Sequence, residues 1–256
     1  MLLFIIRHAD PDYPNNTITE HGHQEARALA ERMAGVGLTR IYTSPLGRAR
    51  DTARYTADET GIEPVVLDWT CELKTPAVDH GPYGKLAPFN LAGEVIRADL
   101  EASRSHDGIA RYPYIQESPI AECAQAVRDA SDDFLKELGY SREGGRYRCV
   151  EPNGERIALF CHGGFAGVLI SHLLEIPLPL IWSGMWLAPS SVTTVFFEQR
   201  SETWAVPRCM AIGDTGHLYH AGLPTQSRGI VARNWPGADR ITSSSLLMAG
   251  REAEPK

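Results

Sequence analysis

The chain has 256 residues, of which 25 are Lys or Arg and 32 are Asp or Glu, so its formal net charge is −7. The apolar fraction of 43% is ample for a packed core and excludes a wholly disordered chain. An acidic chain is a poor candidate for non-specific binding to nucleic acid or to an anionic membrane, so we expect neither as a partner. This length favours a single domain over 1–256, with room for an insertion.

The cysteines indicate a reducing compartment, because they form no C-x-x-C pair and no zinc-type cluster. They are Cys71, Cys123, Cys149, Cys161 and Cys209. The apolar opening, 1–6, meets Arg7 at once and is too short for a signal-peptide core or a membrane span. We therefore expect a soluble, cytoplasmic protein.

The first predicted element is a strand over residues 2–6, because this continuous apolar run is typical of a strand buried on both faces. This run ends at Arg7-His8. A loop rich in Pro and Asn, 11–17, then precedes a helix that Thr19 can cap and Gly35 ends.

A second strand–helix–strand unit follows. The pattern predicts a strand over 40–44, and Ser44-Pro45 has the form of an N-cap followed by Pro at the first helical position. The helix should continue to about Gly61, and residues 64–67 read as a third strand.

The middle of the chain, 74–117, has no clean periodicity and is interrupted by Gly and Pro, which is typical of a functional cap or lid. A helix should then begin at Ser118-Pro119 and end at Gly139, followed by a polar loop over 140–155.

The last third begins with an apolar strand over 156–161, which ends at His162, and a helix follows. Residues 191–197 and 204–212 alternate like a pair of neighbouring strands. The polar, Ser-rich tail, 223–256, is a candidate for poor order.

The alternation of strands and helices predicts an α/β fold, a three-layer α/β/α sandwich with a mostly parallel central sheet and a cap-like insertion. Ligands of such sheets bind beyond the carboxyl ends of the strands. Two predicted strands end there in a histidine, His8 and His162, so we expect the functional site at this edge.

The residues gathered at this edge point to phosphate chemistry. Arg7 and Arg48 carry permanent charge and can bind phosphate oxygens bidentately, and the backbone amides at Gly163 would lie at a helix N-terminus, which favours anions. A neutral histidine nitrogen among these groups can attack phosphorus and form a phosphohistidine, while the cations stabilise the transferring oxygens. This chemistry requires no metal and no other cofactor.

Five separated segments resemble motifs of the histidine phosphatase superfamily, also called the phosphoglycerate mutase-like family. Residues 3–9 (LFIIRHA) resemble its strand followed by R-H-G/A, and residues 19–26 (TEHGHQEA) are similar to L-T-x-x-G-x-x-Q-A. Residues 43–53 (TSPLGRARDTA) match S-x-L-x-R-A-x-x-T-A, 160–164 (FCHGG) resemble the second histidine motif, and 190–194 (SSVTT) resemble the strand that follows. Each motif alone is weak, but their order and spacing together are highly specific.

The resemblance implies a role for each residue at the site. His8 would be the nucleophile, and Arg7, Arg48 and His162 would complete the phosphate pocket. The family's proton donor is an acidic residue just after the third strand, and Glu72 stands at that position. It would protonate the leaving oxygen and then activate water.

Two features of the site stay open at this point. His80 or Asp79 from the insertion could replace Glu72 as the proton donor. The loop residue that helps to bind phosphate after the first motif could be Asn15 or Asn16.

Both extensions that mark the glycolytic mutases are absent. The first motif continues as RHADPD over 7–12 instead of R-H-G-E-S-x-W-N, and the acid is followed by LKTP over 73–76 instead of R-H-Y-G. We therefore expect a metal-independent phosphomonoester hydrolase that acts on a small phosphorylated metabolite. The alternatives are mutase-type phosphoryl transfer and a non-catalytic phosphate-binding or interaction module on the same fold.

Other residues invite different hypotheses, which we rank lower. His21 and His23 lie in the first turn of a surface helix and lack a carboxylate cluster, so we expect no metal there. Cys161 is better explained as a buried strand residue than as a thiol nucleophile. Apolar residues such as Trp186 and Leu187 could pair subunits in a homodimer.

Overall fold

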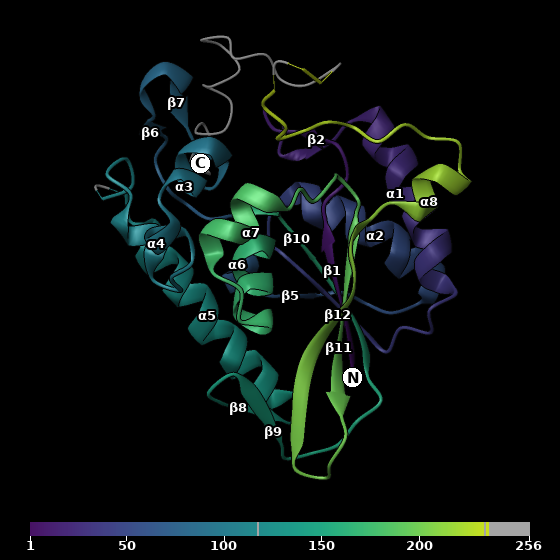
Figure 1. The fold of residues 1–256 in the computed structure, drawn as a ribbon. Helices are drawn as coiled ribbons and strands as arrows, with labels where there is room; N and C mark the ends of the chain where they lie inside the picture. The colour runs from purple at the N-terminus through teal and green to yellow at the C-terminus, as the bar shows by residue number, and fades with distance from the viewer. Residues whose placement is uncertain (117, 233, 236–256) are drawn as a thin grey trace.

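The structure, a computed structural model, describes residues 1–116, 118–232 and 234–235. Within this part of the chain the strands form one large sheet in the order β5-β4-β10-β1-β11-β12-β9-β8 (Figure 1). Its strands are β1 (Leu2–Arg7), β4 (Arg40–Thr43), β5 (Val65–Val66), β8 (Tyr140–Glu143), β9 (Arg146–Cys149), β10 (Arg156–Cys161), β11 (Val192–Gln199) and β12 (Trp204–Asp214).

The sheet is mixed, with a parallel half that contains the predicted functional edge. β1 runs parallel to β10, which runs parallel to β4, and β4 runs parallel to β5. β11 joins the other side of β1 in the antiparallel sense, and β12, β9 and β8 extend the sheet by antiparallel pairing. The register sets Arg7 beside Cys161, so that the residues after the two central strands lie next to each other.

Helices cover both faces of the sheet, and β1 is apolar on both of its faces from Leu2 to Ile6. Leu3 and Ile5 point to the face covered by α5, α6 and α7, whereas Phe4 and Ile6 point to the face covered by α1 and α2. The helices are α1 (Glu20–Ala34), α2 (Gly47–Thr60), α3 (Gly93–Ala98), α4 (Leu100–Ser103), α5 (Ile120–Glu137), α6 (Gly163–Leu174), α7 (Leu178–Gly184) and α8 (Gly216–His220). The predicted α/β class with helices on both faces is confirmed.

The insertion consists of short pieces rather than long helices or strands, which explains its lack of periodicity. It holds a two-stranded sheet of β6 (Val78–Asp79) and β7 (Lys85–Leu86), followed by α3 and α4. Arg97 of α3 donates to the Ser183 hydroxyl of α7, at 3.2 Å, so the insertion is tied to the main body beside α7.

Most predicted helices and strands are present. Thr19 caps α1 as predicted and accepts a hydrogen bond from the Gly22 amide at 3.0 Å. Gly61 ends α2 in the left-handed conformation, with φ of 71°. The 191–197 and 204–212 segments form the antiparallel pair β11–β12.

The predicted helix starts at the two Ser-Pro pairs are wrong. α2 has Leu46 at its N-cap, and Ser44 lies before the helix, where its hydroxyl contacts His162. At α5 the N-cap is Pro119, with no side-chain cap bond, and Ser118 precedes it. A Ser-Pro pair can therefore mark the approach to a helix without capping it.

The polar loop predicted over 140–155 is also wrong in part, because it contains the hairpin β8–β9. The turn includes Gly144 at φ of 63°, a conformation that favours glycine. Tyr140 and Tyr147 are buried and pack against Phe197. The hairpin therefore has an apolar face, which the many polar residues in this part of the sequence made hard to predict.

Four further elements were not predicted. β2 (Pro11–Asp12) pairs with β3 (Thr17–Ile18). The helices α7 and α8 form in segments that have few apolar residues at helical spacing. Leu187, named above as an exposed dimer residue, is buried, whereas Trp186 is exposed. Every helix in the described part of the chain is too short or too polar to cross a membrane.

The strand that ends at His162 depends on its apolar packing. Phe160 of β10 is fully buried and packs in the apolar cluster that includes residues of α1 and α2. We expect Phe160→Ala to lower the free energy of unfolding by about 3–5 kcal/mol, because it removes a large side chain and leaves a cavity. Urea denaturation measures this change.

The matched control is Val65→Ala on β5, whose side chain is 53% exposed. It should alter the free energy of unfolding by less than about 0.5 kcal/mol. A similar loss for both variants would contradict the packing described for β10.

Candidate active site

The carboxyl ends of β1 and β10 bring two histidines together. His8 follows β1 and His162 follows β10, and their ring centroids are 5.2 Å apart. Arg7 ends β1, and Arg48 lies in the first turn of α2. All four residues are buried. The fold therefore places two imidazoles and two guanidinium groups at the edge of the sheet where the sequence predicts a site.

The hydrogen bonds of His8 determine which ring nitrogen carries its proton. Its Nδ1 lies 2.8 Å from the Ala9 carbonyl oxygen, which can only accept, so Nδ1 is the protonated nitrogen. Nε2 of the neutral ring then carries a lone pair. Burial, followed by the charges of Arg7 and Arg48, holds the pKa of His8 well below its ordinary value of 6.5. The neutral, nucleophilic form is therefore favoured.

His162 is oriented by Ser44. Its Nε2 lies 2.7 Å from the Ser44 hydroxyl, and that hydroxyl accepts a bond from the Leu46 amide at 3.3 Å. If the hydroxyl donates its proton to Nε2, the proton of a neutral ring lies on Nδ1. Burial, together with Arg48, His8 and Arg7, keeps the pKa of His162 well below its usual range. His162 Nδ1 is a buried nitrogen with no protein partner among the described residues.

Arg7 is held by backbone carbonyls from two distant segments. Its Nη1 donates to the Leu187 oxygen at 2.6 Å and to the Arg228 oxygen at 3.2 Å. Its Nε is buried without a hydrogen-bond partner in the described part of the chain, and an ideal Cβ on Gly163 would lie 3.5 Å from it. Arg7 is therefore fixed beside the first residue of α6.

Arg48 is positioned by the loop between β2 and β3. Its Nη1 donates to Asn16 Oδ1 at 3.2 Å, and its guanidinium lies 5.5 Å from the ring centroid of Tyr13. The loop approaches α2 so closely that a Cβ on Gly47 would lie 2.0 Å from the Asn16 carbonyl oxygen. Of the two predicted asparagines, Asn16 contacts the site, whereas Asn15 is exposed and bonds to Asp12.

Glu72 reaches the N-terminus of α6. Its carboxylate accepts from the amides of Gly164 at 3.1 Å and Phe165 at 2.8 Å, and also from its own neighbour, Leu73, at 3.0 Å. A Cβ on Gly164 would lie 2.8 Å from Glu72 Oε1, so only glycine leaves room for this contact. Glu72 is thus bonded to Gly164, which lies two positions after His162 at the start of α6.

This contact changes the predicted role of the helix N-terminus. The amides at Gly163 and Gly164 were expected to cradle an anion, but those of Gly164 and Phe165 already donate to Glu72. The carboxyl group of Glu72 thus occupies the place at this helix end where an anion was expected. Gly163 keeps its place at the first turn, next to Arg7.

The alternative acids from the insertion make their contacts within the insertion. His80 is buried, accepts from the Ala92 amide at 3.3 Å and packs edge-on against Tyr114. Asp79 is exposed and accepts from the Gly81 amide. Glu72, by contrast, contacts the helix that follows His162, so the geometry favours it as the acid.

Two buried carboxylates, Asp10 and Glu25, lie near the end of β1 and were not predicted from the sequence. Asp10 accepts from Arg228 Nε at 2.7 Å and from the Thr19 hydroxyl at 2.7 Å. Glu25 is fully buried and accepts from the Asp10 amide at 2.7 Å, and burial raises its pKa to about 7. Glu25 and Thr19 stand inside a motif quoted above, but no sequence signal identifies Arg228.

The residues considered for other chemistry have structural partners. His23 lies 2.9 Å from the Tyr55 hydroxyl, and His21 lies 3.3 Å from Glu25. Within the described residues, no three His, Cys, Asp or Glu side chains are grouped to hold a metal ion. Cys161 is buried in β10, and burial raises the pKa of its thiol, so it suits packing rather than nucleophilic attack.

Known proteins resemble this chain in sequence over most of its length. A family model described as the histidine phosphatase superfamily, branch 1, matches residues 3–209. The protein named "Probable phosphoglycerate mutase GpmB" of Erwinia tasmaniensis is 30% identical over 219 residues, which cover 84% of this chain and 89% of the relative. The protein of the same name from Yersinia enterocolitica is 26% identical over 84% of this chain and 94% of its own length.

Solved structures share the fold. A phosphoserine phosphatase from Entamoeba histolytica has a TM-score of 0.57 at 19% identity, over 85% of this chain and 98% of that one. A mycobacterial glucosyl-3-phosphoglycerate phosphatase has a TM-score of 0.53 at 20% identity, over 82% and 97% of the two chains. Together with the family match and the paired histidines, these results lead to one conclusion: the chain belongs to the histidine phosphatase superfamily.

Proposed function

We propose that this protein is a metal-independent phosphomonoester hydrolase that works through a phosphohistidine on His8. The observation that carries the proposal is the fixed tautomer of His8, whose Nδ1 bond to the Ala9 carbonyl leaves an unprotonated Nε2 among buried cationic groups. A neutral nitrogen held in this way can attack phosphorus without a base to remove a proton.

The groups around His8 suit a phosphoryl group. Arg7 Nε, and His162 Nδ1 in the tautomer that accepts from Ser44, are buried donors that lack protein partners among the described residues, and burying such donors unpaired is costly. Phosphoryl oxygens would satisfy them, and the charges of Arg7 and Arg48 would stabilise the negative charge that spreads over these oxygens during transfer. The protein's own cations thus supply the stabilisation that a metal ion supplies in other phosphatases.

The reaction divides into two steps. In the first, His8 Nε2 forms a bond to phosphorus, the bond from phosphorus to the leaving oxygen breaks, and a protonated Glu72 gives its proton to that oxygen. In the second, Glu72 takes a proton from water, the water oxygen bonds to phosphorus, and the bond to Nε2 breaks to restore His8. In-line transfer requires Glu72 and His8 on opposite sides of the phosphorus.

Mutase-type phosphoryl transfer is the second candidate, because the relatives from Erwinia tasmaniensis and Yersinia enterocolitica are named as probable phosphoglycerate mutases. The two reactions share the first step and differ in the acceptor of the phosphoryl group. The absence of both mutase extensions, at 9–12 and 73–76, favours water as the acceptor.

The proposal predicts that purified protein releases phosphate from phosphomonoesters and keeps this activity in an excess of chelator. His8→Ala should lower kcat by at least about a thousandfold, since the covalent route is lost. A phosphate-release assay and a circular dichroism spectrum, which verifies folding, measure both effects. Activity that survives in His8→Ala, or that disappears with chelator and returns with metal, would contradict the proposal.

The lowered pKa of His8 predicts the acid side of the pH profile. Protonation of His8 destroys the nucleophile, and this occurs well below pH 6.5, so kcat/KM should begin to fall only well below that pH. Two esters with different phosphate pKa values separate the substrate's titration from that of the enzyme. A half-maximal point at or above pH 6.5 with both esters would be inconsistent with the buried, neutral His8.

The role of Glu72 predicts a dependence on the leaving group. Glu72→Gln removes the proton donor, so kcat for an alkyl phosphate should fall by about 10²–10⁴. The fall should be much smaller for p-nitrophenyl phosphate, because nitrophenolate leaves without protonation. Equal losses for the two substrates would indicate that Glu72 only supports the start of α6.

A further inference from the structure

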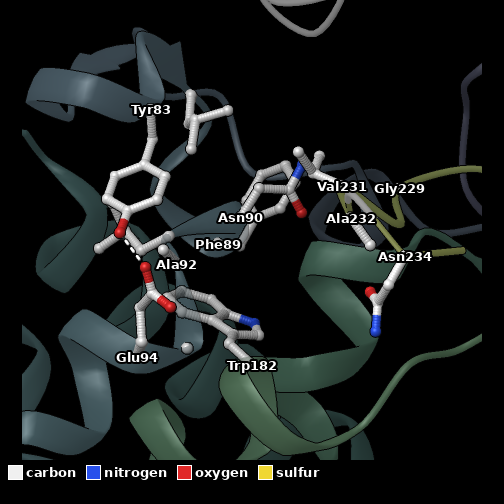
Figure 2. Close-up of a pocket in the computed structure, with 13 residues that line it drawn as sticks. Tyr83, Phe89, Asn90, Ala92, Glu94, Trp182, Gly229, Val231, Ala232 and Asn234 are labelled. Atoms are coloured by element: carbon white, nitrogen blue, oxygen red, sulfur yellow. Dashed lines mark hydrogen bonds between the residues drawn. The ribbon is translucent and has the colours of Figure 1, made fainter. Parts of the chain in front are cut away.

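A pocket lies between the insertion, α7 and the segment that follows α8 (Figure 2). Its volume is about 400 Å³. Aliphatic side chains line it together with aromatic rings, two carboxamides and one carboxylate, the last three kinds being Tyr83, Phe89, Trp182, Asn90, Asn234 and Glu94. The five motifs that carry the family resemblance include none of these residues.

The pocket adjoins the catalytic groups on two sides. Trp182 Nε1 donates to the Gly164 carbonyl at 3.3 Å, and a Cβ on Gly164 would lie 2.8 Å from the Phe89 ring. Gly164 is also the residue whose amide holds Glu72. On the other side, Gly229 lines the pocket and follows Arg228, whose carbonyl holds Arg7.

This position identifies the part of the substrate that the pocket can hold. The leaving oxygen must lie on the side of Glu72, because Glu72 protonates it and His8 attacks from the opposite side. The group attached to that oxygen therefore extends past Gly164 toward Phe89 and Trp182. Their rings are inclined at 60°, with centroids 6.2 Å apart, and form an aromatic corner.

The lining indicates the chemistry of that group. Aromatic faces pack well against C–H groups, and the carboxamides of Asn90 and Asn234 can both donate to and accept from hydroxyls. Glu94 accepts from the Tyr83 hydroxyl, which orients the carboxylate at the pocket wall, as the dashed line in Figure 2 shows. A carboxylate accepts hydrogen bonds from hydroxyl groups and repels an anion.

We infer that this pocket binds the alcohol portion of the substrate and that this portion is a polyhydroxylated group without negative charge, such as a sugar, an amino sugar or a polyol. The inference rests on the proposed phosphatase function and makes Glu94 the residue that selects against anionic leaving groups.

The test compares three hexose phosphates of similar size: glucose 6-phosphate, which is otherwise neutral, glucosamine 6-phosphate, with an amine, and 6-phosphogluconate, with a carboxylate. We expect kcat/KM for glucose 6-phosphate and for glucosamine 6-phosphate each to exceed that for 6-phosphogluconate by at least about tenfold. Glu94→Lys should lower the ratio of kcat/KM for glucose 6-phosphate to that for 6-phosphogluconate by about tenfold or more, because the variant attracts the carboxylate of 6-phosphogluconate instead of repelling it.

Glu101→Lys is the matched control, since Glu101 lies in the same insertion, is highly exposed and pairs with Arg111 on the surface. It should leave the ratio unchanged. A wild-type preference for 6-phosphogluconate over the two other esters, or a ratio that Glu94→Lys does not move, would overturn the inference while phosphate release confirms the enzyme class. Absence of phosphate release from every ester, p-nitrophenyl phosphate included, would overturn the proposed function and the inference with it.

Discussion

The hydrogen bond between His8 Nδ1 and the Ala9 carbonyl is the interaction on which the proposed chemistry depends. It fixes one tautomer and leaves Nε2 unprotonated. Burial and the neighbouring guanidinium groups then disfavour the charged ring, so that the pKa falls and the nucleophile stays neutral. The surroundings that stabilise a bound phosphoryl group and those that keep His8 reactive are therefore the same.

The cations that create this environment are positioned by segments far apart in the sequence. Arg7 is held by the carbonyls of Leu187 and Arg228, and Arg48 by Asn16. Arg228 in turn pairs with the buried Asp10, next to the strand that carries His8. The segment after α8 thus contributes both to the phosphate site and, through Gly229 and Asn234, to the pocket beside it. The proposed catalysis and the proposed substrate selection therefore both depend on this segment.

The sequence predicts the strand ends well because each central strand is a continuous apolar run followed at once by a polar residue. This pattern locates His8 and His162, and the motif spacing locates Arg48. It could not reveal the role of Ser44, whose proline neighbour suggests a helix cap, nor Arg228, whose contacts depend on tertiary structure alone. The pocket lies beyond prediction for the same reason, since three regions without periodicity meet there.

The most direct test of the central claim is to trap the phosphoenzyme. Protein mixed with substrate, quenched rapidly in alkali and digested should yield a peptide that contains His8 and carries one phosphoryl group, and acid should remove that group. The same treatment of His8→Ala should yield no phosphorylated peptide. Phosphorylation at another residue, or turnover without any phosphoenzyme in a quench fast enough to sample a single turnover, would contradict the account.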